Sequence, residues 1–324
     1  MKKFVAFLLT LMLVLGIGAA VAEETYSDVS SVTVKKVYKL TNANMSSPAE
    51  TFTLEQVGAG RVTDGDATAA PALGTITGAI FDEGAATVDG TTGNITIALP
   101  TYEKVGVYEY TLREVAGKTA GVTYYGKDIL LKVTVIEQGG KVRVAAVHTE
   151  SGEGDDTAKR DNFPNEYSAG DLNVTKTVAG NLGDQSKKFD FTVKFTKPDG
   201  KDVNSTITAT VAGVGATNFN IAWDDKGTYT YTFQLAHGQK ASFANLPYGV
   251  SYTVTETAVT GYETTKTGDS GTINAAEHTA AFTNTKEGSI DTGVTTENLP
   301  YVLLIGFVVL AGAALLIKRK AHNN

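Results

Sequence analysis

Lysine, glutamate and asparagine recur in the same order in the two halves of this chain, which contains no cysteine. The first set is Lys36, Glu114 and Asn165, and the second set is Lys176, Glu256 and Asn284. The Lys-to-Glu spacing is 78 residues in the first set and 80 in the second, which indicates an internal duplication. An amine, a carboxamide and a carboxyl group that are buried together have the chemistry needed to form a covalent Lys–Asn amide.

Such a reaction requires a neutral lysine amine, because an ammonium group has no lone pair. Burial in an apolar core lowers a lysine pKa and also favours the neutral form of a neighbouring carboxyl group. A protonated Glu can polarise the Asn carbonyl and transfer a proton to the leaving ammonia. Because the amine and the carboxamide are held together in one molecule, each can reach an effective molarity of roughly 10⁵ M or more. Each site reacts once, so the protein would be its own substrate rather than an enzyme.

The segments around the six residues alternate apolar and polar positions, as half-buried strands do. In both halves the Lys shares a strand face with two aliphatic residues, and we expect Lys35 to point to solvent. Each Glu ends a Tyr-Thr-x-x-Glu segment, and each Asn ends a Phe-x-Asn. The matching segments are Val32–Lys36 and Leu172–Lys176, Tyr110–Glu114 and Tyr252–Glu256, and Phe163–Asn165 and Phe282–Asn284.

The rest of the central region predicts an all-β fold. Short alternating segments are separated by turns rich in Gly, Asn and Asp, which is typical of a β-sandwich. The clearest predicted strands are 52–57, 93–99, 107–113, 129–136, 141–147, 189–195, 206–211, 229–235 and 250–255.

We expect two domains, at 23–168 and 169–288, with the boundary in the segment Tyr167–Asp171. The Glu-to-Asn spacing is 51 residues in the first half and 28 in the second. An extra hairpin over Asp128–His148 in the first domain would explain the difference.

The two ends of the chain carry export signals. Residues 1–22 predict a signal peptide, because two lysines precede an apolar run that ends in Ala20-Val21-Ala22. Residues 299–317 are apolar and long enough for a transmembrane helix. The basic tail Lys318–Lys320 would lie in the cytoplasm.

Composition excludes several classes of function. The formal net charge of −7 argues against nucleic-acid binding. The chain contains only four His, without metal-ligand spacing, and no cysteine, so we expect neither a metal nor a cofactor. We also find no catalytic triad and no phosphate-binding loop.

With these motifs the chain resembles Gram-positive major pilins of the streptococcal T-antigen type. The resemblance implies two tandem Ig-like β-sandwich domains, each with an intramolecular Lys–Asn isopeptide bond between its first and last strands and a Glu beside the bond. Residue by residue it implies a Lys36–Asn165 bond promoted by Glu114 and a Lys176–Asn284 bond promoted by Glu256.

The resemblance also implies a sortase sorting signal over 289–324. Ser289-Ile290-Asp291-Thr292-Gly293 ends in the required Thr-Gly, with Ser-Ile in place of the usual Leu-Pro. A sortase would cleave between Thr292 and Gly293 and transfer Thr292 to an amine. For the amine of the next subunit we favour Lys159, with Lys118 and Lys127 as alternatives.

The function implied is that of the shaft subunit of a covalent pilus on a Gram-positive surface, held in the membrane before sortase cleavage. The implied partners are identical pilin subunits, a pilin sortase, peptidoglycan and minor pilins. The alternative is a minor pilin or the stalk of a cell-wall-anchored adhesin.

Overall fold

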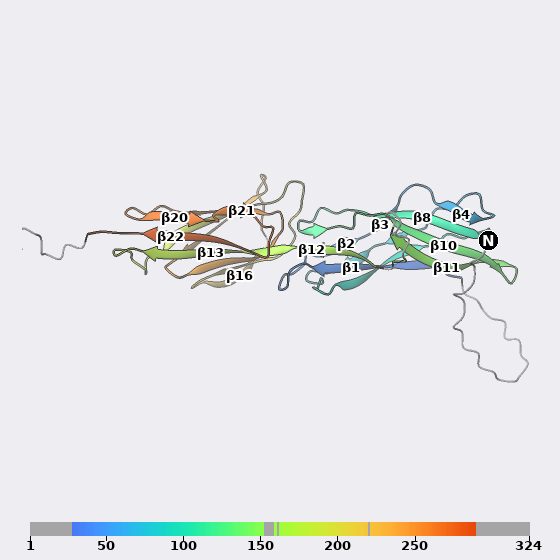
Figure 1. Ribbon diagram of the computed structural model, residues 1–324, viewed down its shortest axis with the longest axis horizontal. Helices are drawn as coiled ribbons and strands as arrows, with labels where there is room; N and C mark the ends of the chain where they lie inside the picture. Colours follow the sequence, from blue (N-terminus) through green and yellow to red (C-terminus); the bar gives the residue numbers. More distant parts are fainter. Residues whose placement is uncertain (1–27, 152–158, 161, 220, 290–324) are drawn as a thin grey trace, which may run out of the picture.

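The computed structural model describes residues 28–151, 159–160, 162–219 and 221–289. Its elements are strands, and in the described residues they form two sandwiches arranged end to end along the long axis of the molecule (Figure 1). This confirms the expected all-β class. The predicted signal peptide and the predicted span 299–317 lie outside the described residues. Within the described ranges, no helix is long and apolar enough to cross a membrane.

The N-terminal sandwich packs two five-stranded sheets, of order β5-β7-β1-β12-β9 and β11-β10-β8-β3 with β4 also paired to β8. A small β2-β6 pair completes it. Its strands are β1 (Ser31–Leu40), β2 (Glu50–Phe52), β3 (Leu54–Gln56), β4 (Arg61–Gly65), β5 (Ile76–Thr77), β6 (Ala79–Phe81), β7 (Thr91–Ala98), β8 (Gly106–Glu114), β9 (Val122–Thr123), β10 (Ile129–Gln138), β11 (Lys141–Ser151) and β12 (Asn162–Tyr167).

The C-terminal sandwich packs a six-stranded sheet, of order β16-β15-β18-β13-β22-β20, against a four-stranded sheet, β17-β14-β19-β21. Its strands are β13 (Ala169–Ala179), β14 (Phe189–Thr196), β15 (Ile207–Val211), β16 (Gly215–Phe219), β17 (Thr228–Leu235), β18 (Lys240–Pro247), β19 (Ser251–Glu256), β20 (Glu263–Thr267), β21 (Ser270–Thr272) and β22 (Glu277–Thr285).

The structure contains the extra hairpin of the first half. Strands β10 and β11 pair antiparallel across the turn at Gly139 and Gly140, where both glycines have positive φ. Only glycine adopts that conformation without a steric cost, which explains the Gly-Gly pair at this turn. The predicted strand 52–57 is instead divided, because Phe52 is the last residue of β2 and Leu54–Gln56 form β3 in another sheet.

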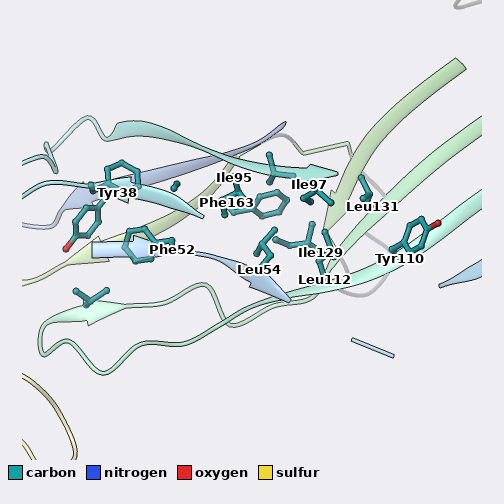
Figure 2. Packing of buried hydrophobic residues seen from close by; sticks show 14 of the residues in the cluster. Tyr38, Phe52, Leu54, Ile95, Ile97, Tyr110, Leu112, Ile129, Leu131 and Phe163 are labelled. Carbon is teal, nitrogen blue, oxygen red and sulfur yellow. The ribbon is translucent and has the colours of Figure 1, made fainter. Parts of the chain in front are cut away.

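Alternating side chains fill the space between the sheets. In the N-terminal sandwich, aliphatic residues of β7, β8 and β10 meet aromatic residues of β1, β2 and β12 (Figure 2). Tyr38, Phe52 and Phe81 pack edge to face, with ring centroids 5.1–5.6 Å apart. A second cluster around Phe191, Phe233 and Phe243 forms the C-terminal core. These two cores surround the residues that the sequence singled out.

The first and last strands of each sandwich are neighbours in the same sheet. Strand β1 pairs with β12 in parallel, and β13 pairs with β22 in the same way. Tyr38 lies opposite Asn165, and Val178 lies opposite Asn284. Each Lys is two residues before the residue opposite the Asn, so Lys and Asn are diagonal neighbours on one face of the sheet.

Candidate functional site

The N-terminal site brings Lys36, Glu114 and Asn165 into direct contact inside the sandwich. Lys36 Nζ lies 2.6 Å from Asn165 Oδ1 and also donates to Glu114. Asn165 Nδ2 donates to Glu114 Oε1 at 2.5 Å. Glu114 ends β8 in the facing sheet, so the carboxylate reaches across the core to a Lys and an Asn on adjacent strands. Each member of the triad touches the other two.

Strand phase explains why these polar groups are buried. Val34, Lys36 and Tyr38 alternate with more exposed residues in β1, so all three point into the core, while Lys35 is exposed as expected. Lys36 and Asn165 are each 1 % exposed. The aromatic rings of Phe52 and Tyr125 lie 5.3 and 5.7 Å from Lys36 Nζ and exclude water from it.

A backbone group completes the N-terminal site. The N–H of Tyr125 donates to Asn165 Oδ1 at 2.9 Å. Attack on the Asn carboxamide would place negative charge on this oxygen, and a preorganised N–H donor stabilises such an oxyanion. The sequence carried no signal for this contact, because any residue except proline supplies a backbone N–H.

The C-terminal site repeats the triad but lacks both hydrogen bonds to the Asn Oδ1 atom that the N-terminal site has, the one from the Lys Nζ and the one from a backbone N–H. Lys176 Nζ lies 3.0 and 2.9 Å from the two carboxylate oxygens of Glu256, and Asn284 Nδ2 donates to Glu256 Oε1. Asn284 Oδ1 is buried and has no hydrogen-bond donor among the described residues. The counterpart of the Tyr125 N–H is therefore missing there. Phe189 lies 4.3 Å from Lys176 Nζ and shields it.

Burial controls the protonation of both lysines. Loss of solvent lowers the pKa of Lys36 below its ordinary value of 10.5, and the facing Glu114 only partly offsets this effect. Burial lowers the pKa of Lys176 in the same way, against the opposing effect of Glu256. A lowered pKa makes the neutral, nucleophilic amine more accessible at both sites. At the N-terminal site this amine lies at contact distance from the carboxamide that it would attack, because Lys36 Nζ is 2.6 Å from Asn165 Oδ1.

Lys159 lies on the N-terminal sandwich, away from both triads. It forms an isolated antiparallel bridge with Glu150 at the end of β11, and its side chain is exposed. The next residue continues this pairing, because the Arg160 N–H donates to Thr149 O at 2.9 Å. Lys118, by contrast, lies at the junction with the second sandwich, where its carbonyl accepts from the Asp202 N–H. Thr292 and Gly293 lie outside the described residues.

The described residues contain no group of three or more His, Asp or Glu side chains arranged to hold a metal ion. The conspicuous polar cluster outside the triads is an ion-pair network. Glu109 contacts Arg61 and Lys132, and Lys132 Nζ lies 2.7 Å from Glu150 Oε2.

Comparisons with known proteins agree with this geometry. Residues 32–168 match the family described as the Spy0128-like isopeptide containing domain. Residues 170–286 match a domain of unknown function. A pilin of Streptococcus pyogenes serotype M1 is 29 % identical over 92 % of this chain and 93 % of its own length. The chain is therefore similar to a pilin along nearly its whole length.

Solved structures show the same fold. The chain resembles the major pilin of Streptococcus pyogenes with a TM-score of 0.54 and 24 % identity, covering 81 % of this chain and 100 % of that one. The T3.2 major pilin of the same species gives a TM-score of 0.51 at 21 % identity, covering 80 % and 99 %. The Streptococcus pyogenes pilus tip adhesin Cpa is 30 % identical, but over only 39 % of this chain and 18 % of the adhesin.

Proposed function

We propose that the chain is the repeating shaft subunit of a covalent pilus on a Gram-positive cell surface. The observation that carries this proposal is similarity to a pilin along nearly the whole of both chains. Two buried Lys/Glu/Asn triads, each bridging the first and last strands of a sandwich, support the same role. A subunit that bears load and lacks cysteine gains covalent closure from such bonds. The domains are 23–168 and 169–288.

Each triad would form its bond without the help of an enzyme. Neutral Lys36 Nζ attacks Asn165 Cγ, and the carbonyl oxygen receives the negative charge beside the Tyr125 N–H. The Cγ–Nδ2 bond then breaks, and Nδ2 leaves as ammonia. Glu114, in contact with both nitrogens, carries the proton from the attacking amine to the leaving one. The products are one amide and one ammonia, and Glu256 would serve Lys176 and Asn284 in the same way.

Polymerisation would use a different chemistry. A pilin sortase cleaves Thr292–Gly293 and holds the Thr292 carbonyl as a thioester on its own cysteine. The Lys159 amine of the next subunit attacks this carbonyl, the C–S bond breaks, and the sortase thiol is released. A cell-wall amine of peptidoglycan ends the polymer. The chain is held in the membrane by 299–317 until the first cleavage.

Intact mass spectrometry of residues 23–292 tests the intramolecular chemistry. We expect a deficit of two ammonia molecules, one for each triad. The Asn165→Ala and Asn284→Ala variants should each lack one of these losses. A full, unmodified mass would contradict the cross-links and would leave an ordinary two-domain surface protein.

A polymer assay tests the shaft role. Cells that express the full chain with its pilin sortase should give a ladder of covalent multimers from this subunit alone. Lys159→Arg should abolish the ladder and leave export of the monomer intact, whereas Lys118→Arg and Lys127→Arg should keep it. A ladder that persists in Lys159→Arg would remove Lys159 as the linking residue. Absence of any ladder would favour the minor-pilin or adhesin-stalk role.

A further inference from the structure

The segment that follows β8 connects the N-terminal triad to the second sandwich. It begins after Glu114, the last residue of β8, and it ends at Tyr125, whose N–H donates to Asn165 Oδ1. The carboxyl group and the backbone donor of one site therefore lie at the two ends of a single donor loop, residues 115–125. The contacts that hold the middle of this loop determine whether the backbone donor lies in position.

The second sandwich holds the middle of the donor loop by backbone contacts. The Asp202 N–H donates to Lys118 O at 2.9 Å, and the Ala120 N–H donates to Asp202 O at 2.8 Å. Thr119 and Asp202 thereby form a parallel bridge between the two sandwiches. The Asp202 side chain is exposed. The bridge is therefore made by the backbone of residue 202 and not by its carboxylate.

A carboxylate of the first sandwich also holds the donor loop. Glu50 of β2 accepts a hydrogen bond from the Thr119 hydroxyl and, at 3.2 Å, from the Tyr124 hydroxyl. Tyr124 directly precedes the residue that supplies the N–H, and its ring packs edge to face on Phe52 with centroids 5.9 Å apart. Phe52 in turn covers Lys36 Nζ, at 5.3 Å. Glu50 therefore joins the bridged part of the loop to the part that borders the triad.

Strand β9 is too short to fix the end of the donor loop alone. Its two residues pair with Glu166 and Tyr167, which follow Asn165 closely in β12. Just before β9, Gly121 O accepts from the Ser168 N–H at 2.8 Å. So few hydrogen bonds contribute little net stability. The Glu50 contacts and the bridge to the second sandwich supply the additional constraint.

The C-terminal site provides a comparison within the same molecule. The segment after Glu256 is bonded to its own sandwich, where the Thr257 N–H donates to Asp190 O at 2.9 Å. Asn284 Oδ1 has no donor among the described residues. The site whose loop is bridged to another sandwich thus has a backbone donor on its Asn oxygen, and the site whose loop is bonded to its own sandwich lacks one.

We propose that docking of the second sandwich controls formation of the Lys36–Asn165 bond by holding the donor loop in place, and that Glu50 is a positioning residue in the same reaction. The inference rests on the proposed self-catalysed cross-linking and adds its regulation. While the sandwiches are apart, the triad can assemble, but the Tyr125 N–H is not held at the oxygen on which charge develops. Docking brings this donor into position, and the attack proceeds. The first sandwich is therefore closed covalently only after the second has folded beside it.

Time-resolved peptide mass spectrometry of the full chain tests the role of docking. A pulse of cell-free synthesis starts the reaction, acid stops it, and the Lys36–Asn165 and Lys176–Asn284 cross-linked peptides are measured separately. Asp202→Pro removes the N–H of the bridge, and the matched control Asp202→Ala keeps it. Because removal of an oxyanion donor slows acyl transfer by about 10²–10³-fold, we expect Asp202→Pro to slow the first bond by at least about tenfold. Asp202→Ala should leave its rate unchanged.

The Lys176–Asn284 bond is an internal control in this experiment. It should form at the wild-type rate in both variants, which shows that the second sandwich has folded. A wild-type rate for the Lys36–Asn165 bond in Asp202→Pro, with the second bond intact, would overturn the proposal.

A second variant separates the sandwiches without changing the donor loop. It combines Asn245→Gly, which removes two hydrogen bonds to Ser46, with a Gly-Ser-Gly-Ser insertion between Ser168 and Ala169. X-ray scattering verifies that the sandwiches have separated. We expect the same slowing of the first bond, and the second bond should keep its rate. Undiminished formation of the first bond in the separated chain would contradict control by docking.

Glu50→Ala and Glu50→Gln test the positioning role within the first sandwich. Gln keeps an acceptor oxygen for Thr119 and Tyr124 and removes the charge, whereas Ala removes both. We expect Ala to slow the first bond by at least about tenfold and Gln to restore most of the wild-type rate. If Gln is as slow as Ala, the charge of Glu50 acts on the reaction and the positioning role is wrong.

The control by docking and the chemistry fail separately. A wild-type chain without either cross-link contradicts the self-catalysed chemistry itself. A wild-type chain with both cross-links, whose Lys36–Asn165 bond forms equally fast in Asp202→Pro and in the separated chain, keeps the chemistry and contradicts the control by docking.

Discussion

At the residue scale, the two triads differ in the hydrogen bonds to the Asn carbonyl oxygen, which Lys36 Nζ reaches in the first site and Lys176 Nζ does not in the second, and these bonds bear on the rate of reaction. Asn165 Oδ1 accepts from the Tyr125 N–H, and Asn284 Oδ1 has no such donor in the part of the chain that the structure describes. Removal of one oxyanion donor typically slows acyl transfer by about 10²–10³-fold. We therefore expect the N-terminal bond to form first. A pulse of synthesis followed by intact mass of Asn165→Ala and Asn284→Ala separates the two rates.

Proline at position 125 tests the same donor directly. Tyr125→Pro removes the N–H and the aromatic ring, while Tyr125→Ala removes the ring alone and is the matched control. We expect Tyr125→Pro to slow the first ammonia loss by about 10²-fold and Tyr125→Ala to slow it much less. Equal rates for the two variants would show that the ring, and not the N–H, controls the reaction.

The burial of Lys36 predicts a pH dependence of stability in a variant that cannot form the bond. In Asn165→Ala the amine stays unreacted, and its folded-state pKa lies below the ordinary 10.5. The unfolded chain then binds more protons than the folded one in the window between those two values. The free energy of unfolding of this variant should therefore rise with pH up to about 10.5, by at most about 1.4 kcal/mol per unit. Urea denaturation at several pH values from 7 to 10 measures this free energy. The double variant Lys36→Met/Asn165→Ala should lose the pH dependence.

The sequence predicted the residues of each triad because strand phase places Lys36 and Lys176 on the core face. It did not predict the Tyr125 N–H, which comes from backbone geometry after the two-residue strand β9. It also could not give the register of the two parallel strand pairs, which is set by packing between residues far apart in the chain. The residue types therefore revealed which side chains form each triad, but they did not reveal which hydrogen bonds reach the Asn oxygen in each site.

At the element scale, one asparagine supplies two of the hydrogen bonds that join the two sandwiches. Asn245 in β18 has a φ of 66°, and its side chain donates to Ser46 O and Thr206 O, both at 2.9 Å. Its Oδ1 accepts from the Ser46 N–H at 3.1 Å. The carbonyl and the N–H of Ser46 are thereby held to the second sandwich, and a nearby bridge pairs Thr119 with Asp202.

Replacing Asn245 should loosen the junction without unfolding either sandwich. Asn245→Gly keeps the left-handed backbone and loses three hydrogen bonds, each worth about 0.5–1.5 kcal/mol net. We expect a broader distribution of interdomain angles in X-ray scattering and little change in the melting temperature. Asn245→Ala adds backbone strain of about 1–2 kcal/mol and should also lower the melting temperature. If the Asn245→Gly variant stays rigid and fully extended, the stiffness comes instead from the remaining junction contacts, among them the Thr119–Asp202 bridge and the Asn42 hydrogen bonds.

At the scale of the whole molecule, the proposed covalent bonds between first and last strands would determine which residues can be stretched. In a pilus linked through Lys159 and Thr292, tension enters just before β12 and continues directly into β13. It then crosses from Lys176 to Asn284 and leaves through β22. The proposed C-terminal bond would bypass everything between those two residues. The proposed N-terminal bond would close a loop that spans 129 residues and lies beside this path.

Single-molecule pulling can separate the two bonds by the choice of attachment points. Pulled through position 159 and the C-terminal end, Asn284→Ala should release on the order of 350 Å of extra length, and Asn165→Ala should release none. Pulled through residue 28 and the C-terminal end, Asn165→Ala should release on the order of 400 Å. In the wild-type chain, in which both bonds have formed, neither choice of attachment points should give this extra length. An Asn165→Ala chain that lengthens when pulled from position 159 would contradict this load path, because it would place the N-terminal sandwich under tension.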